Sequence, residues 1–450
     1  MVLSVAACGS KKNGSGDTDA GNNGTPDACV GLQCQIVNCG AMGQQPTTLT
    51  GTVFAPNGTL PLYGIQVYIP LTDPGTPPDT LECDRCSVTP PGNPIASTVS
   101  GEDGTFRLEN VPAGDNIPLV IKSGKWQRIV TIPRVDQCVD TPLTAAETRL
   151  PKNRAEGNIP KIAITTGNAD TLECLARKLG IADSEIGKAG DQSRIHLYTG
   201  NGTSSFSSGF GGTGAIPSAT PFWSDANELK KYDIVILSCE GQQRGATKPQ
   251  MALDAMKNYA DSGGRVFASH WHNIWISGNF ENSSMSQTPA VWNTIGTWNS
   301  GTNYSQTITD VIDEVSNPKG AAFANWMLNV MGSTVRGELA VDEARTTSVT
   351  LDTTRAERWV YTKGNTSNPV VPAGRAQMFQ FTTPNEVATD QRCGKVVFTD
   401  MHVSGTPQGN PIPAYPNNCA GGPTNLMLTA QEKALAFMFF DIASCVGGIL

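Results

Sequence analysis

The stretch Gly263-Gly-Arg-Val-Phe-Ala-Ser-His-Trp-His272 decides the fold of the second half of this chain. A helix predicted over 249–262 ends at the two glycines, and a short apolar strand follows and stops at His270. The earlier run 232–238 has an apolar centre, Ile234-Val-Ile-Leu237, which is typical of a strand buried on both faces of a parallel sheet. Helices and strands are predicted to alternate over 159–447, with a polar insertion over 277–320. This alternation predicts an α/β domain with an open parallel sheet.

Polar residues end several of these predicted strands. In open α/β sheets, ligands bind beyond the carboxyl ends of the strands, where such side chains gather. The chain has only four histidines, and three of them are here, so they are candidate metal ligands: His270, His272 and His402. With Glu240 and Asp400 they are also candidate catalytic acids and bases, and Asp170, Trp271 and Trp275 are candidate ligand-binding residues. The alternative is that all of these side chains are hydrogen-bonded, packed structural residues.

Residues 48–145 show the pattern of an all-β domain. Thr50-Gly-Thr-Val-Phe54 and Tyr63-Gly-Ile-Gln-Val-Tyr-Ile69 alternate apolar and polar residues, and the segment 100–114 places glycine turns on both sides of Phe106 and Leu108. The region resembles the carboxypeptidase-regulatory-like (transthyretin-like) β-sandwich. That resemblance implies a spacer or binding module without catalytic residues.

The α/β region resembles the flavodoxin-like fold of class I glutamine amidotransferases, including their ThuA-like branch. The resemblance is carried by the helix, the Gly263-Gly264 pair, the strand to Ser269 and the late strand Gly394-Lys-Val-Val-Phe-Thr-Asp-Met-His402. Amidotransferases have a nucleophilic cysteine at the turn where this chain has His270, and the ThuA-like branch has histidine there. Without that cysteine no acyl-enzyme of the amidotransferase type can form.

The amino-terminal Leu3-Ser-Val-Ala-Ala-Cys8 resembles a bacterial lipobox. The resemblance implies that 1–8 is part of a lipoprotein signal, that Cys8 is acylated and that the lipid membrane is a partner. Residues 9–28 are almost entirely small and polar, which predicts a flexible tether. The whole chain also resembles lipoproteins of myxobacterial type through the segments 117–126, 237–241 and 268–272. With Gly9 after the cysteine, this implies an outer-membrane lipoprotein facing the periplasm or the cell surface.

Twelve cysteines indicate disulfide bonds formed in an oxidising compartment. Residues 29–47 are expected to form a small cysteine-rich cap. The expected topology pairs Cys393 with Cys445 and Cys174 with Cys239, and it favours a bridge from Cys83 to Cys138. With Cys8 acylated, these assignments leave an odd number of cysteines, so one is free or one pairing is wrong.

Composition limits the function classes further. The net charge is −8 and no basic cluster is present, so nucleic acid is not expected as a partner. We expect an exported, lipid-anchored envelope protein that is non-catalytic, either binding a ligand such as a glycan or serving a structural role. The alternative is a sugar-directed hydrolase or isomerase that uses the histidine and carboxylate cluster. No cofactor is expected except a divalent metal at the histidines.

Overall fold

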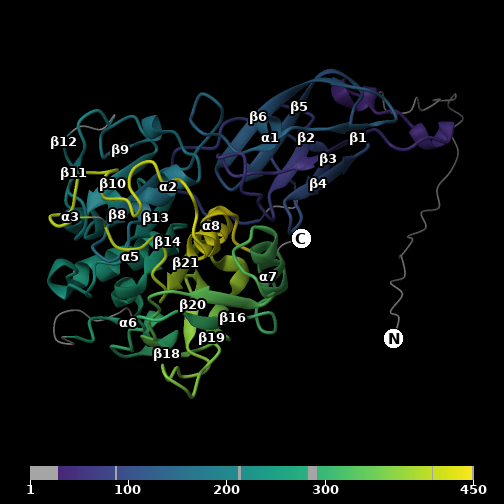
Figure 1. Ribbon diagram of the computed structural model, residues 1–450. Helices are drawn as coiled ribbons and strands as arrows, with labels where there is room; N and C mark the ends of the chain where they lie inside the picture. The colour runs from purple at the N-terminus through teal and green to yellow at the C-terminus, as the bar shows by residue number, and fades with distance from the viewer. Residues whose placement is uncertain (1–28, 87–88, 211–213, 282–290, 408, 448–450) are drawn as a thin grey trace, which may run out of the picture.

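The computed structural model describes residues 29–86, 89–210, 214–281, 291–407 and 409–447 (Figure 1). The expected signal (1–8) with Cys8 and the expected tether (9–28) lie outside these residues. None of the helices in the described part of the chain combines the length and the apolar character needed to cross a bilayer.

The first part of the chain folds into two small sheets. Two short 3₁₀ helices, η1 (Gly31–Gln35) and η2 (Cys39–Met42), precede them in the sequence. One sheet has the strand order β4-β1-β7 and the other β3-β2-β5-β6. Strand β4 shows how the two sheets pack together. Its Phe106 and Leu108 are buried and its other three residues are exposed, as a period of two requires. The strands are β1 (Thr48–Thr52), β2 (Gln66–Pro70), β3 (Pro94–Val99), β4 (Thr105–Glu109), β5 (Gly114–Ser123), β6 (Trp126–Val135) and β7 (Asp140–Pro142), and the helix α1 (Ala145–Thr148) follows.

The second part is built on a ten-stranded sheet with the order β17-β16-β19-β20-β21-β14-β13-β8-β10-β9. Six neighbouring strands are parallel: β8 (Ile162–Thr166), β9 (Ile186–Lys188), β10 (Ile195–Thr199), β13 (Ile234–Leu237), β14 (Arg265–Ser269) and β21 (Gly394–Thr399). Four are antiparallel: β16 (Ile308–Ile312), β17 (Glu338–Val341), β19 (Glu357–Thr362) and β20 (Ala376–Thr383). The sheet is therefore mixed, and not wholly parallel as expected. The four antiparallel strands extend the sheet beyond β21, and one of them, β16, comes from the expected insertion (277–320).

Short elements surround this sheet. Two strand pairs lie outside it, namely β11 (Ser205–Phe206) with β12 (Gly214–Ala215) and β15 (Gly296–Trp298) with β18 (Ser348–Leu351). The α-helices are α2 (Leu175–Lys178), α3 (Ala219–Trp223), α4 (Ala226–Leu229), α5 (Gln250–Asp261), α6 (Ile274–Ser277), α7 (Gly320–Asn329) and α8 (Ala430–Ala443). The remaining 3₁₀ helices are η3 (Leu172–Cys174), η4 (Asp183–Glu185), η5 (Gly245–Thr247), η6 (His270–Asn273), η7 (Trp292–Thr294) and η8 (Thr389–Gln391).

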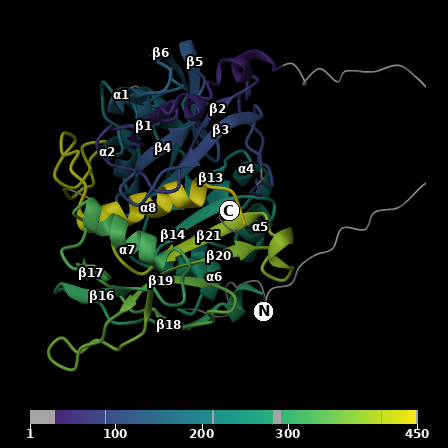
Figure 2. The same cartoon turned by 90° about the vertical axis from the view of Figure 1, so that its right-hand side faces the viewer.

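Helix α8 joins the two parts of the molecule. It begins at the capping box of Thr429 and Glu432 and is buried almost all round, as expected of a helix without a polar face. Figure 2 shows α8 (yellow) running between the two small sheets and the large sheet. On the side of the small sheets, Trp126 packs edge-on against Phe439, with ring centroids 6.2 Å apart. Residues of the small sheets, of α8 and of one face of the large sheet therefore form one continuous apolar core.

The disulfide bonds differ from every pairing predicted above. The structure pairs Cys83 with Cys393 and Cys86 with Cys445, because the loop after β2 reaches the start of β21 and the end of α8 together. Cys138 pairs with Cys39 of the cysteine-rich cap. The other two disulfides are Cys29–Cys34 and Cys174–Cys419, and Cys239 is free and buried. The prediction expected the start of β21 and the end of α8 to meet. Both Cys393 and Cys445 instead form disulfides with cysteines of the loop after β2.

Candidate functional site

Four adjacent parallel strands bring reactive side chains to one edge of the large sheet. The strands β21, β14, β13 and β8 are consecutive neighbours. Just beyond their carboxyl ends lie His402, His270, Cys239 and Asp170. Parallel strands end at the same edge, so residues far apart in the chain meet here.

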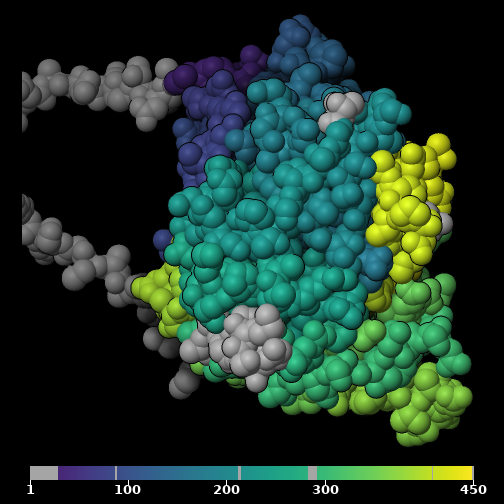
Figure 3. Space-filling view, turned by 90° about the vertical axis from the view of Figure 1, so that its left-hand side faces the viewer, coloured from purple at the N-terminus to yellow at the C-terminus, as the bar shows by residue number. Residues whose placement is uncertain are grey.

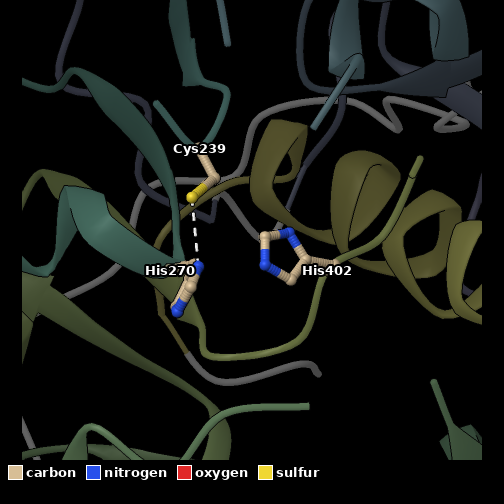
Figure 4. Close-up of side chains that lie close together, drawn as sticks. All are labelled: Cys239, His270 and His402. Atoms are coloured by element: carbon tan, nitrogen blue, oxygen red, sulfur yellow. Dashed lines mark hydrogen bonds between the residues drawn. The ribbon is translucent and has the colours of Figure 1, made fainter. Parts of the chain in front are cut away.

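Cys239, His270 and His402 form a compact group (Figure 4). The thiol sulfur of Cys239 lies 3.0 Å from Nδ1 of His270. The imidazole rings of His270 and His402 are 4.6 Å apart between centroids and nearly perpendicular. One sulfur and two ring nitrogens thus lie within 4.8 Å of one another, and no second group of this kind occurs among the described residues.

The backbone at His270 is held in an unusual conformation. Its φ angle is 48°, in the left-handed region that non-glycine residues seldom occupy. The residue lies at the abrupt change from β14 to η6, directly after Ser269. A strained residue of this kind persists where its surroundings hold it, and such positions concentrate at functional sites.

Asp170 organises the other side of the group. Its carboxylate accepts hydrogen bonds from the Ser269 hydroxyl at 2.5 Å and from the backbone N–H groups of Val403 and Ser404 at 3.0 and 3.3 Å. Nδ1 of His402 lies 3.5 Å from Oδ1 of Asp170, a distance at which the two attract each other when the imidazole is charged. Asp170 therefore ties the ends of β8, β14 and β21 together.

Burial sets the protonation of the three clustered side chains. It lowers the pKa of His270, and the charge of His402 lowers it further. It raises the pKa of the Cys239 thiol, and the negative charge of Asp170 adds to this effect. Burial also opposes the charge on His402, but the carboxylate of Asp170 more than offsets it and raises the pKa of His402. Burial therefore favours the neutral imidazole of His270 and the protonated thiol of Cys239, whereas Asp170 raises the pKa of His402.

A late segment packs at this edge of the sheet, against residues that follow β8 and β10. We name residues 403–428 the cover segment; all of it is described except 408. Cys419 is disulfide-bonded to Cys174, Asn418 donates a 2.8 Å hydrogen bond to Glu173, and Tyr415 pairs with Phe206. In Figure 3 this late part of the chain (yellow) lies on the surface beside the teal residues that precede it in sequence. In the group itself His270 is 1 % exposed, and the side chain of His402 is 10 % exposed.

Three of the predicted site residues do not join the group, because each is engaged elsewhere. His272 lies with Nε2 2.9 Å from the carbonyl of Ser238, and its Nδ1 accepts a hydrogen bond from Trp275. Glu240 forms a buried ion pair with Lys248. Asp400 accepts hydrogen bonds from the hydroxyl of Thr347 at 2.6 Å and from backbone N–H groups of Thr347 and Ser348. These residues support the edge of the sheet without facing the group.

The aromatic residues near the edge are also buried. Trp271 is 7 % exposed and Trp275 is 1 % exposed. The guanidinium of Arg345 stacks over Trp271, 5.1 Å from the ring centre, and Trp275 packs against Trp223. Stacking on a sugar needs an open ring face, and these rings are packed against protein.

Cys239 is the member of the group that the sequence prediction missed as a ligand. It was assigned to a disulfide with Cys174, which instead bonds to Cys419. Two signals were present in the sequence: the odd number of remaining cysteines, and the position of Cys239 just after a buried strand. The same position after β14 and β21 is where His270 and His402 occur.

The chain as a whole was compared with known proteins. No family model matches the chain, and no curated protein matches it. Among solved structures, a cytoplasmic protein from Salmonella typhimurium is 11 % identical over 63 % of this chain and 98 % of that one, with a TM-score of 0.31. A GH42 β-galactosidase is 6 % identical over 57 % of this chain and 28 % of that one, with a TM-score of 0.28. A type II cohesin–X-dockerin complex from Acetivibrio cellulolyticus is 17 % identical over 31 % of this chain and 74 % of that one, with a TM-score of 0.15. Scores this low carry no argument about fold or function.

Proposed function

We propose that this chain is an exported, lipid-anchored envelope protein that acts without catalysing a reaction. The observation that carries the proposal is its disulfide framework, in which five bonds join ten cysteines. Such a framework forms and persists in an oxidising compartment and is rare in the bacterial cytosol. The lipobox-like segment ending at Cys8 supplies the anchor in this proposal.

The proposed architecture is a transthyretin-like sandwich followed by a flavodoxin-like domain of the amidotransferase-like class. The strand order supports it: β10-β8-β13-β14-β21 reads second, first, third, fourth, fifth when the short β9 is set aside. This is the order of doubly wound flavodoxin-like sheets, whose ligand sites lie at the carboxyl edge. The three-stranded and four-stranded sheets of the first part support the sandwich.

The same edge supports a binding or structural role over the hydrolase or isomerase alternative. A sugar substrate would have to reach His270, which is only 1 % exposed. The neighbouring thiol of Cys239 is a poor nucleophile, since burial raises its pKa and only the thiolate attacks. Catalysis on a bulky substrate would require the protein around His270 to open.

Cell fractionation tests the anchoring. The chain is expressed in a Gram-negative host with a basic, apolar leader fused ahead of Leu3, so that Leu3 to Cys8 provides the cleavage site. We expect the protein in the outer-membrane fraction with incorporated fatty acid, and Cys8→Ala to abolish both. The control variant Cys29→Ala/Cys34→Ala removes a disulfide of two exposed cysteines and should fractionate like the parent. Equal membrane association of Cys8→Ala and the parent would contradict the proposal.

A further inference from the structure

We propose that Cys239, His270 and His402 bind one transition-metal ion of the zinc and copper class. This inference goes beyond the proposed function and does not depend on membrane anchoring. It rests on the convergence of one sulfur and two imidazole nitrogens at the carboxyl edge of the large sheet.

The spacing of the donors fits such an ion after a small movement. Zinc bonds of about 2.1 Å to nitrogen and about 2.3 Å to sulfur, at a tetrahedral angle, separate the two ligand atoms by roughly 3.5 Å. Sγ of Cys239 and Nδ1 of His270 are 3.0 Å apart, so the pair must open by ~0.5 Å. A rotation of the Cys239 side chain supplies a movement of this size without shifting either strand.

The ring of His402 is oriented so that one of its nitrogens can bind the same metal ion. Its Nδ1 faces Asp170 at 3.5 Å, which leaves Nε2 for a ligand, and Figure 4 shows a ring nitrogen of His402 directed toward Cys239 and His270. A carboxylate behind a histidine is the usual outer partner in metal sites, where it fixes the ring and raises the basicity of the ligating nitrogen. Asp170 is itself fixed by Ser269 and two backbone N–H groups, so this partner is rigid.

The two donor atoms closest together, Sγ of Cys239 and Nδ1 of His270, face each other in the interior of the protein. Ten other cysteines of the described residues form disulfides, yet Cys239 is free and fully buried beside two imidazoles. A thiol with only a packing role does not need two histidines converging on its sulfur.

The donor set also selects the metal. Thiolate and imidazole suit zinc and copper, whereas magnesium and calcium require oxygen ligands. Three protein ligands leave one coordination position for a water molecule or a small anion. Access is from the side of His402, the most exposed of the three side chains.

The test uses Co²⁺ as a spectroscopic substitute for zinc on the purified full chain, after treatment with a chelator and without reductant. We expect one Co²⁺ per chain and a thiolate-to-cobalt charge-transfer band that Zn²⁺ removes by competition. His402→Gln should weaken binding at least 10-fold, and Asp170→Asn by 10- to 100-fold. Cys239→Ser should abolish the charge-transfer band. Copper is tested separately through the intense visible absorption of a Cu(II)–thiolate bond.

His196→Gln is the matched control, because His196 is also a buried histidine. It is hydrogen-bonded to Tyr232 and lies away from the carboxyl edge of the sheet. It should bind Co²⁺ as the parent does. Circular dichroism and thermal melting check that each variant folds. If Cys239→Ser does not fold, the spectrum of the parent and the affinity of His402→Gln decide the question. A folded parent with no charge-transfer band and no saturable one-to-one binding of Co²⁺, Zn²⁺ or copper would overturn the proposal, as would equal affinity for Mg²⁺.

Discussion

Lys178 of α2 and Glu432 of α8 form a buried ion pair, with Nζ 2.7 Å from Oε1, although 254 positions separate them in the chain. The lysine side chain is 4 % exposed and the glutamate side chain is fully buried. Glu432 also accepts a hydrogen bond from the backbone N–H of Thr429 and so closes the capping box of α8. The pair therefore links α2, which follows β8 in the sequence, to α8, the helix that joins the two parts of the molecule.

Breaking this pair from one side should be strongly destabilising. Lys178→Met leaves the Glu432 charge buried without its partner, and we expect a loss of about 3–5 kcal/mol in the free energy of unfolding. Adding Glu432→Gln removes that charge and keeps an acceptor for the capping box, so the double variant should recover most of the loss. Urea denaturation of the parent, both single variants and the double variant measures the coupling. Additive losses would show that the two side chains do not interact.

The two disulfides between the loop after β2 and the large sheet should contribute separately to stability. Cys83→Ser/Cys393→Ser and Cys86→Ser/Cys445→Ser each remove one of them, and each should cost about 2–4 kcal/mol. The Cys29–Cys34 disulfide encloses a loop with a sequence separation of only 5, so Cys29→Ser/Cys34→Ser should cost much less. Thermal melting followed by calorimetry compares the three. Equal losses in all three would contradict this ranking.

The parts should still unfold together when both of these disulfides are absent. Trp126 packs against Phe439 and Phe440 of α8, and the apolar core continues across this contact. We therefore expect one calorimetric transition in the fourfold serine variant, at a lower temperature than in the parent. Two separated transitions would show that the disulfides, and not the shared core, couple the parts.

The thiol of Cys239 should be inert in the folded protein. It is fully buried, and burial and the charge of Asp170 raise its pKa, so little thiolate forms and reagents cannot reach it. Iodoacetamide at pH 8 should leave Cys239 unmodified in the native chain, with or without a chelator. It should modify Cys239 after denaturation without reductant, as read by peptide mass mapping. Modification at the rate of a free cysteine in the native state would refute the burial.

Asp310 of β16 should make stability depend on pH. Its side chain is fully buried, both carboxylate oxygens lack hydrogen-bond partners among the described residues, and burial and the charge of Asp400 raise its pKa to about 8. A folded pKa above the unfolded value stabilises the protein at low pH, and this contribution is lost as the pH rises from about 4 to about 8. Asp310→Asn keeps a neutral side chain of the same shape.

The variant should therefore be more stable than the parent near pH 8, by a few kcal/mol, and nearly equal to it at pH 4. Denaturation curves between pH 4 and 9 measure the difference. The exposed Asp254 of α5 provides the control, since Asp254→Asn should leave the pH profile of the parent unchanged. A constant difference between Asp310→Asn and the parent across this range would exclude titration of Asp310 as the cause.

The sequence alone predicts the parts that depend on local patterns. The apolar runs 232–238 and 263–269 lead to β13 and β14, and the capping box at Thr429 and Glu432 marks the start of α8. The antiparallel strands β16 and β17 were not predicted. They are only five and four residues long, and β16 has Asp310 at a buried position, so neither gives a long apolar or alternating run.

For the site, the sequence placed His270, His402 and Asp170 at the correct edge, because the end of a parallel strand can be read from its apolar run. It could not separate His272, two residues further along, from His270. That distinction depends on the backbone at His270 and on the hydrogen bonds that hold His272 to Ser238 and Trp275.

The sequence by itself determined the β/α alternation, the carboxyl-edge position of the histidines and a cysteine content suited to an oxidising compartment. Only the tertiary structure decided which cysteines pair and which one stays free. Pairing requires Cα atoms about 5–6 Å apart, and such distances arise between segments as remote as Cys86 and Cys445, which are 359 positions apart. The same long-range packing brings Cys239 against His270 and attaches the cover segment to Cys174. Local patterns set where strands begin and end, but the contacts between distant segments set what meets at those ends.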